Sequence, residues 1–160
     1  MIRTYKCVCI CGLGAALFAA TVKPSNAFLD KTRFATDIGV AFFSFHHFVW
    51  APYHAGSFAR TAPHHDKALL KAGIALLFAY NRLKAADHLA HVSKSPMLHK
   101  LATSLDHMQS SFSSVGSDLK AHKFVPAEIM SLNKAVDLVG ETALKSGLKL
   151  KDVPIHIPGV

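Results

Sequence analysis

Apolar residues recur at helical spacing along most of this chain, and no segment alternates like a half-buried strand. The pattern predicts a first helix from about Lys31 to Trp50. Because the residue before a proline avoids the helical region of backbone space, we expect this helix to end near Pro52. Its apolar positions repeat at intervals of three and four and form one face, made by Ile38, Phe42, Phe45 and Val49.

A second helix is predicted from about His64 to Lys94. Pro63 suits its first turn, and Ser95-Pro96 ends it. The apolar stripe consists of Leu69, Gly73, Leu76, Tyr80 and Leu83, and it is widened by Leu70, Ile74 and Leu77. Because the apolar surface nearly encircles this helix, we expect it to be the central and most buried element.

Two further helices follow. The third has apolar residues at strictly alternating intervals of three and four, which form a narrow seam of the coiled-coil type. These residues are Leu98, Leu101, Leu105, Met108, Phe112, Val115 and Leu119. The fourth is predicted from about Pro126 to Lys145, with Gly147 just past its end. Its core face is made by Ile129, Leu132, Val136, Val139 and Ala143.

Residues 146–160 contain Pro154 and Pro158 and are predicted to form an extended tail. Short connections between the four helices favour an all-α fold, a single compact bundle of about four antiparallel helices. Two long helices with hairpins packed across them are the alternative. No internal repeat or linker divides the chain, so residues 28–160 are interpreted as one domain.

Residues 1–27 have the composition of a secretory signal peptide, in which a basic start and an uncharged apolar run precede a small-residue site. Cleavage is predicted after Ala27, with an uncleaved anchor as the alternative. All three cysteines fall in this segment. Residues 28–160 therefore exclude disulfides, a thiolate nucleophile and cysteine-ligated metal centres. A cysteine-free exported chain suggests secretion or the bacterial cell envelope.

The chain is basic, with 18 Lys and Arg against 10 Asp and Glu and a net charge of +8. The charges are scattered, and no basic run contains interleaved aromatic residues, so nucleic-acid binding is not expected. No GxSxG elbow or glycine-rich phosphate loop is present, so no catalytic residue is assigned and the interpretation leans away from an enzyme.

The 11 histidines suggest two candidate metal sites. One lies at the corner between the first two helices and combines His46 or His47 with His54, His64 and His65. The other lies at the end of the second helix and combines Asp87, His88 and His91 with Asp37 or His99. Imidazole and carboxylate ligands suit zinc, copper, nickel or haem iron. Neither group contains the HExxH or Cys-x-x-Cys-His motif.

Each candidate has a structural alternative. The paired histidines at the corner could be core-edge or exposed residues, and Asp87 with His91 could be a simple i,i+4 surface pair. Phe45, Trp50 and Tyr53 have the chemistry to wall a haem pocket next to an axial histidine. The same aromatic residues also fit a packed helical core.

The segment HHFVWAPYHAGSF, the long alanine-rich helix and the ending LKLKDVPIHIPGV are similar to small secreted helical proteins of actinobacteria and related soil bacteria. This resemblance implies export and an all-helical fold, and it carries over no activity and no site residues. The leading hypothesis is an exported, non-enzymatic protein that binds a metal ion or haem. The alternative is a secreted or cell-surface interaction protein that binds lipid, wall polymer or a protein partner through an apolar aromatic patch.

Overall fold

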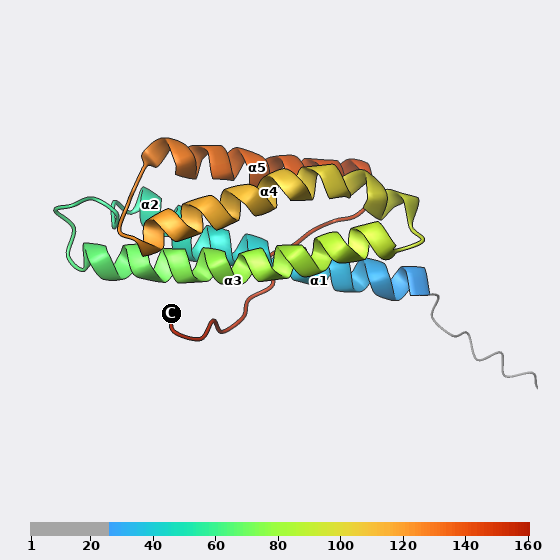
Figure 1. The fold of residues 1–160 in the computed structure, drawn as a ribbon, viewed down its shortest axis with the longest axis horizontal. Helices are drawn as coiled ribbons and strands as arrows, with labels where there is room; N and C mark the ends of the chain where they lie inside the picture. The colour runs from blue at the N-terminus through green and yellow to red at the C-terminus, as the bar shows by residue number, and fades with distance from the viewer. Residues whose placement is uncertain (1–25) are drawn as a thin grey trace, which may run out of the picture.

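The computed structural model describes residues 26–160, and every regular element in this part of the chain is a helix (Figure 1). The four long helices are α1 (Asn26–Phe45), α3 (His65–Val92), α4 (Pro96–Lys120) and α5 (Pro126–Lys145). The predicted all-α bundle is confirmed. The predicted signal peptide falls on residues 1–25, which lie outside the described residues, and on the first two residues of α1. Within residues 26–160, no helix combines the length and apolar character that crossing a bilayer requires.

The long helices pack in two layers, with α1 beside α3 and with α4 and α5 stacked over them (Figure 1). The tight turn at Ser93–Ser95 makes α3 and α4 an antiparallel hairpin. The hydroxyl of Ser93 donates a hydrogen bond to Oδ2 of Asp30 over 2.8 Å. This contact joins the end of α3 to the start of α1, which is the up-and-down arrangement expected of an antiparallel bundle.

Local signals set the ends of α4 and α5. Each helix begins with a proline at its first position, where the missing N–H has no intrahelical partner to lose. After α5, Gly147 adopts a left-handed φ of 81°, and the N–H of Leu148 returns to the carbonyl of Ala143 over 2.8 Å. This is the bonding of a glycine-terminated helix end. The observed bounds of α5 are the predicted ones.

The four predicted apolar faces form the core of the bundle. All four residues of the first face, all seven of the α4 seam and all five of the α5 face are buried. On α3 the stripe is buried except for Tyr80, but the residues predicted to widen it are not: Ile74 and Leu77 are partly buried and Leu70 is exposed. The backbones of α3 and α4 lie very close together at Gly73. A Cβ atom on this residue would lie 2.6 Å from the backbone nitrogen of Lys120 and 2.8 Å from the carbonyl oxygen of Gly116. A side chain here would push the two central helices apart.

The first helix does not end before Pro52, contrary to the prediction. A five-residue π-helix, η1 (His46–Trp50), continues α1 and leads into α2 (Ala51–His54), whose first turn contains Pro52. In η1 the N–H of Ala51 reaches the carbonyl of His46. The wider π turn changes which carbonyl faces each following residue. In a regular α-helix, the ring of a proline clashes with the carbonyl four residues earlier. The π-helical turn before Pro52 relieves this clash, so the helix continues past Pro52.

The tail crosses the bundle as an extended strap over α1 (Figure 1). Val153 donates its backbone N–H to the carbonyl of Gly39 over 2.9 Å, and Ile157 is buried. The contact depends on glycine, because a Cβ at position 39 would collide with the carbonyl oxygen of Lys151 and lie 2.7 Å from Cγ2 of Val153. The predicted extended tail is therefore a packed part of the fold.

Candidate functional site

The aromatic residues predicted to wall a pocket pack against each other. Phe45 is completely buried, with its ring centroid 6.0 Å from that of Trp50 and 6.2 Å from that of Phe112. Trp50 contacts Tyr53 at 5.9 Å, and Tyr53 contacts Phe124 at 6.1 Å. These separations are typical of aromatic clusters in protein cores. The rings fill the space between them, so a flat ligand such as haem would have to displace them.

The histidines of the same corner face different neighbours. Nδ1 of His46 lies 2.8 Å from Oδ2 of Asp152 in the tail. The ring of His47 is exposed and stacks on Phe43 at 5.1 Å. The ring of His54 is exposed and contacts Trp50 edge to face at 4.4 Å.

The other predicted members of the corner are His64 and His65. His64 is exposed and adopts a left-handed φ of 61° just before α3. His65 is partly buried, and its Nδ1 has no hydrogen-bond partner among the described residues. Three ligand atoms do not converge at this corner, since residues 26–160 contain one group that meets this condition and it lies elsewhere.

That group joins the end of α3 to the middle of α4. Asp87 and His91 from α3 and Asp106 from α4 each offer one ligand atom, and the three atoms lie within 4.8 Å of one another. Nε2 of His91 is 3.4 Å from Oδ1 of Asp87. This contact lacks hydrogen-bond geometry, so Oδ1 is a buried oxygen that accepts no hydrogen bond from the described part of the chain. The side chain of His91 is 58% exposed and that of Asp87 is 21% exposed, so solvent reaches the group.

The remaining predicted ligands lie outside the group. His88 and His99 are exposed and contribute no ligand atom to it. Asp37 is buried against α3, with Oδ1 3.7 Å from Nη1 of Arg82. Burial raises the pKa of the Asp37 carboxyl, and the positive charges of Arg82 and Arg33 oppose this effect. Asp37 therefore faces an arginine in the helix interface and takes no part in the group of Asp87.

Asp106 was not among the sequence-predicted ligands. Counting outward from the turn at Ser93–Ser95 places Asp87 opposite Leu101, five residues or about 1.4 helical turns before Asp106. Helical side chains tilt toward the N-terminus of their own helix, so in an antiparallel hairpin Asp87 and Asp106 lean toward each other. The hairpin register combined with this tilt is the signal that could have found Asp106.

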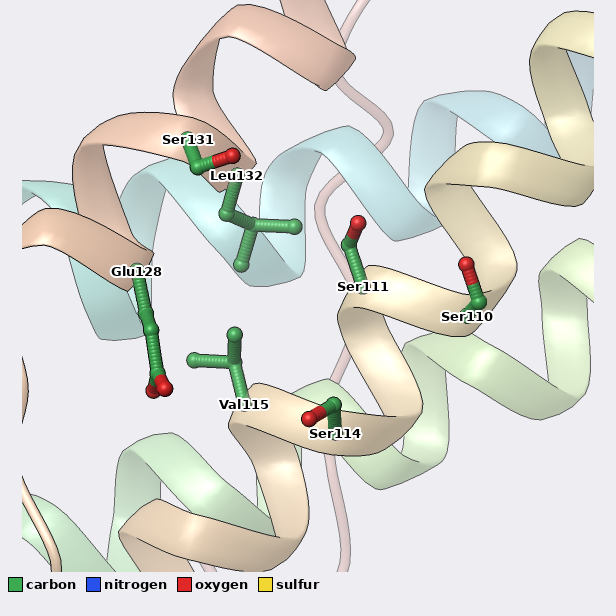
Figure 2. A pocket seen from close by; sticks show the side chains of 7 residues that line it. All are labelled: Ser110, Ser111, Ser114, Val115, Glu128, Ser131 and Leu132. Atoms are coloured by element: carbon green, nitrogen blue, oxygen red, sulfur yellow. The ribbon is translucent and has the colours of Figure 1, made fainter.

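A separate groove of about 310 Å³ lies between α4 and α5, and Figure 2 shows the side chains that line it. Ser110, Ser111 and Ser114 come from α4, while Glu128 and Ser131 come from α5. The hydroxyls of Ser110 and Ser111 both donate to the carbonyl of His107, at 2.9 and 3.0 Å. None of the sequence-predicted site residues lines this groove.

Comparison of the chain with protein-family models, with curated proteins and with solved structures gives no match. The resemblance to secreted helical proteins of soil bacteria stays a prediction.

Proposed function

We propose that this protein binds a divalent transition-metal ion, with zinc as the reference case, through Asp87, His91 and Asp106. The observation that carries the proposal is the convergence of three ligand atoms within 4.8 Å on two helices. α3 and α4 pack closely along the hairpin, so the backbone holds the three residues in place. Two carboxylates and one imidazole are a ligand set that first-row divalent metals accept.

The electrostatics of Asp87 support the same proposal. A buried carboxylate oxygen without a partner costs stability, since it has lost its hydrogen bonds to water. A bound cation would supply the missing partner and would offset the repulsion between Asp87 and Asp106. Metal–ligand distances of about 2.0–2.2 Å place tetrahedral ligand atoms ~3.3 Å apart. The three ligand atoms already lie within 4.8 Å of one another, so a bound ion would have to draw them together by about 1.5 Å at most.

The exposure of the group favours an exchangeable ion over a permanently enclosed one. Structural zinc sites are closed by four protein ligands, whereas three protein ligands leave a position for water or for a second ligand. His91 and Asp106 are both exposed, so an ion can enter from solvent. Together with the predicted export, this arrangement favours capture of a metal ion outside the cell as the role of the protein.

The test is calorimetric titration of the full chain with zinc chloride, compared with manganese and copper salts. We expect one ion per chain at micromolar concentration, and we expect His91→Ala and Asp106→Asn each to weaken binding at least about tenfold. His88→Ala and Asp118→Asn are matched controls, because they remove the same chemical groups from the same two helices outside the group. Binding that is absent, or equally weakened in the controls, contradicts the proposal.

A further inference from the structure

A second groove, open to solvent, lies between the first half of α1 and the tail and has a volume of about 410 Å³. This volume is within the range of about 300–1,000 Å³ that is typical of small-molecule sites. The floor is apolar, made by Phe28 and Ala35 of α1 and by Leu148 and Val153 of the tail. The groove exists because the strap is held against α1 at Gly39.

Three lysines rim this groove: Lys31 from α1, and Lys149 and Lys151 from the tail. In extended backbone, alternate residues point to the same side, so Lys149, Lys151 and Val153 all face the groove. None of the residues that line the groove is acidic. Within residues 26–160, none of the three lysines forms an ion pair.

The acidic residues of the same two segments are engaged elsewhere. Asp30 accepts a hydrogen bond from Ser93, and Asp37 faces Arg82. Asp152, which directly follows Lys151 in sequence, points to the opposite side of the strap and contacts His46. The groove therefore combines an apolar floor with a positive rim that no carboxylate of α1 or the tail neutralises.

We propose that this groove binds one molecule of an anionic amphiphile of the long-chain fatty-acid class. The lysines receive the carboxylate, and the acyl chain covers the apolar floor between α1 and the strap. The apolar lining favours burial of the hydrocarbon chain, and the lysines supply the charge opposite to that of the carboxylate. The hydroxyls of Thr32 and Thr36 donate to carbonyls of α1 at 3.1 and 2.9 Å. The lysines are thus the polar donors available to the head group.

The shape of the groove favours a single chain over a membrane surface. The groove is lined by α1 on one side and by the strap on the other, so its length matches a single acyl chain lying between them better than a flat bilayer. This groove is separate from the proposed metal site of Asp87, His91 and Asp106, which lies between α3 and α4.

The test is calorimetric titration of sodium oleate, below its micelle concentration, into the full chain. We expect one oleate per chain with a micromolar dissociation constant. The variant Lys31→Glu/Lys149→Glu/Lys151→Glu is expected to bind at least about tenfold more weakly, because three favourable charge contacts become repulsive. The matched control, Lys100→Glu/Lys123→Glu/Lys134→Glu, has the same change of net charge at exposed positions outside the groove and should bind within about twofold of the original chain.

A second variant tests the floor of the groove independently of charge. Ala35→Trp places a large side chain in the groove while the lysines remain, and we expect it to abolish oleate binding with cooperative unfolding retained. Dodecyltrimethylammonium should bind at least about tenfold more weakly than dodecanoate, because the two have alkyl chains of similar length and heads of opposite charge. The proposal is overturned by an absence of oleate binding, by equal weakening in the control variant, or by binding seen with phosphatidylglycerol vesicles and not with monomeric oleate.

Discussion

The imidazole of His46 lies 2.8 Å from the carboxylate of Asp152, a residue 106 positions further along the chain. His46 opens the π-helix, and Asp152 belongs to the strap that crosses α1. The neighbouring backbone bond between Val153 and Gly39 and the burial of Ile157 hold the same strap. The histidine that the sequence marked as a ligand candidate therefore contacts the tail of its own chain.

This contact between His46 and Asp152 should contribute less to stability than the apolar anchor further along the strap. Asp152→Asn is expected to lower the free energy of unfolding by less than about 1 kcal/mol, because the two side chains are 38% and 40% exposed. Ile157→Ala should cost about 2–5 kcal/mol, since Ile157 is only 1% exposed. Urea unfolding measures both values. An equal cost for the two variants would show that the His46–Asp152 contact anchors the tail as strongly as apolar burial does.

Glycine-to-alanine substitutions at two helical positions should change stability in opposite directions. Gly73→Ala is expected to destabilise the protein, because the new Cβ would meet the backbone of α4 at 2.6 Å. Gly140→Ala should stabilise it by about 0.4–1 kcal/mol, since alanine favours the helix and the nearest atom, Cε2 of Phe42, lies at an ordinary 3.7 Å. Thermal unfolding distinguishes the two. A stable Gly73→Ala variant would mean that α3 and α4 can separate without cost.

The sequence predicts those parts of the fold that local signals determine. Pro126 and Gly147 bracket α5, and the seam from Leu98 to Leu119 identifies α4, because a proline, a glycine and a repeat each act within a few residues. The passage of the first helix through Pro52 was not predictable in this way. The π-helix at His46–Trp50 is a change in which backbone carbonyl each N–H bonds. The spacing of apolar residues does not reveal such a change.

The candidate site was partly accessible from the sequence for a similar reason. Asp87 and His91 are four residues apart on one helix, so their proximity follows from helical geometry alone. Asp106 joins them through the register of the α3–α4 hairpin, which depends on how the two helices pack. His46 and His47 are neighbours in sequence but point in different directions. In η1, His46 contacts Asp152 of the tail, whereas His47 lies on the outer surface and stacks on Phe43.

The buried carboxyl of Asp37 predicts a specific dependence of stability on pH. Burial raises its pKa above the ordinary value of 3.8, against the opposing charges of Arg82 and Arg33. From pH 3.8 up to the raised pKa, the folded state holds more protons than the unfolded state. The contribution of Asp37 to stability is therefore fully present below pH 3.8 and is lost as the pH rises through this window.

Asp37→Asn removes this titration. The variant should match the original chain at pH values below the window, where Asp37 is protonated in both states, and should be more stable at neutral pH. Arg82→Gln should have the opposite effect at neutral pH, because it withdraws a charge that compensates the buried carboxylate. Urea unfolding over a series of pH values gives the difference curves. A pH-independent difference between Asp37→Asn and the original chain would contradict the assignment.

Zinc should stabilise the folded protein through the group of Asp87, His91 and Asp106. An ion that binds only the folded state adds about 2.7 kcal/mol to the free energy of unfolding at a concentration 100 times its dissociation constant. Protons compete with the metal for the imidazole and the carboxylates, so this stabilisation should shrink as the pH falls. Thermal unfolding with and without zinc measures it, and addition of a chelator should reverse it. The variant His91→Ala should lose the zinc-dependent shift, and His88→Ala should keep it. If zinc still stabilises the His91→Ala variant, the metal binds at other histidines of the chain.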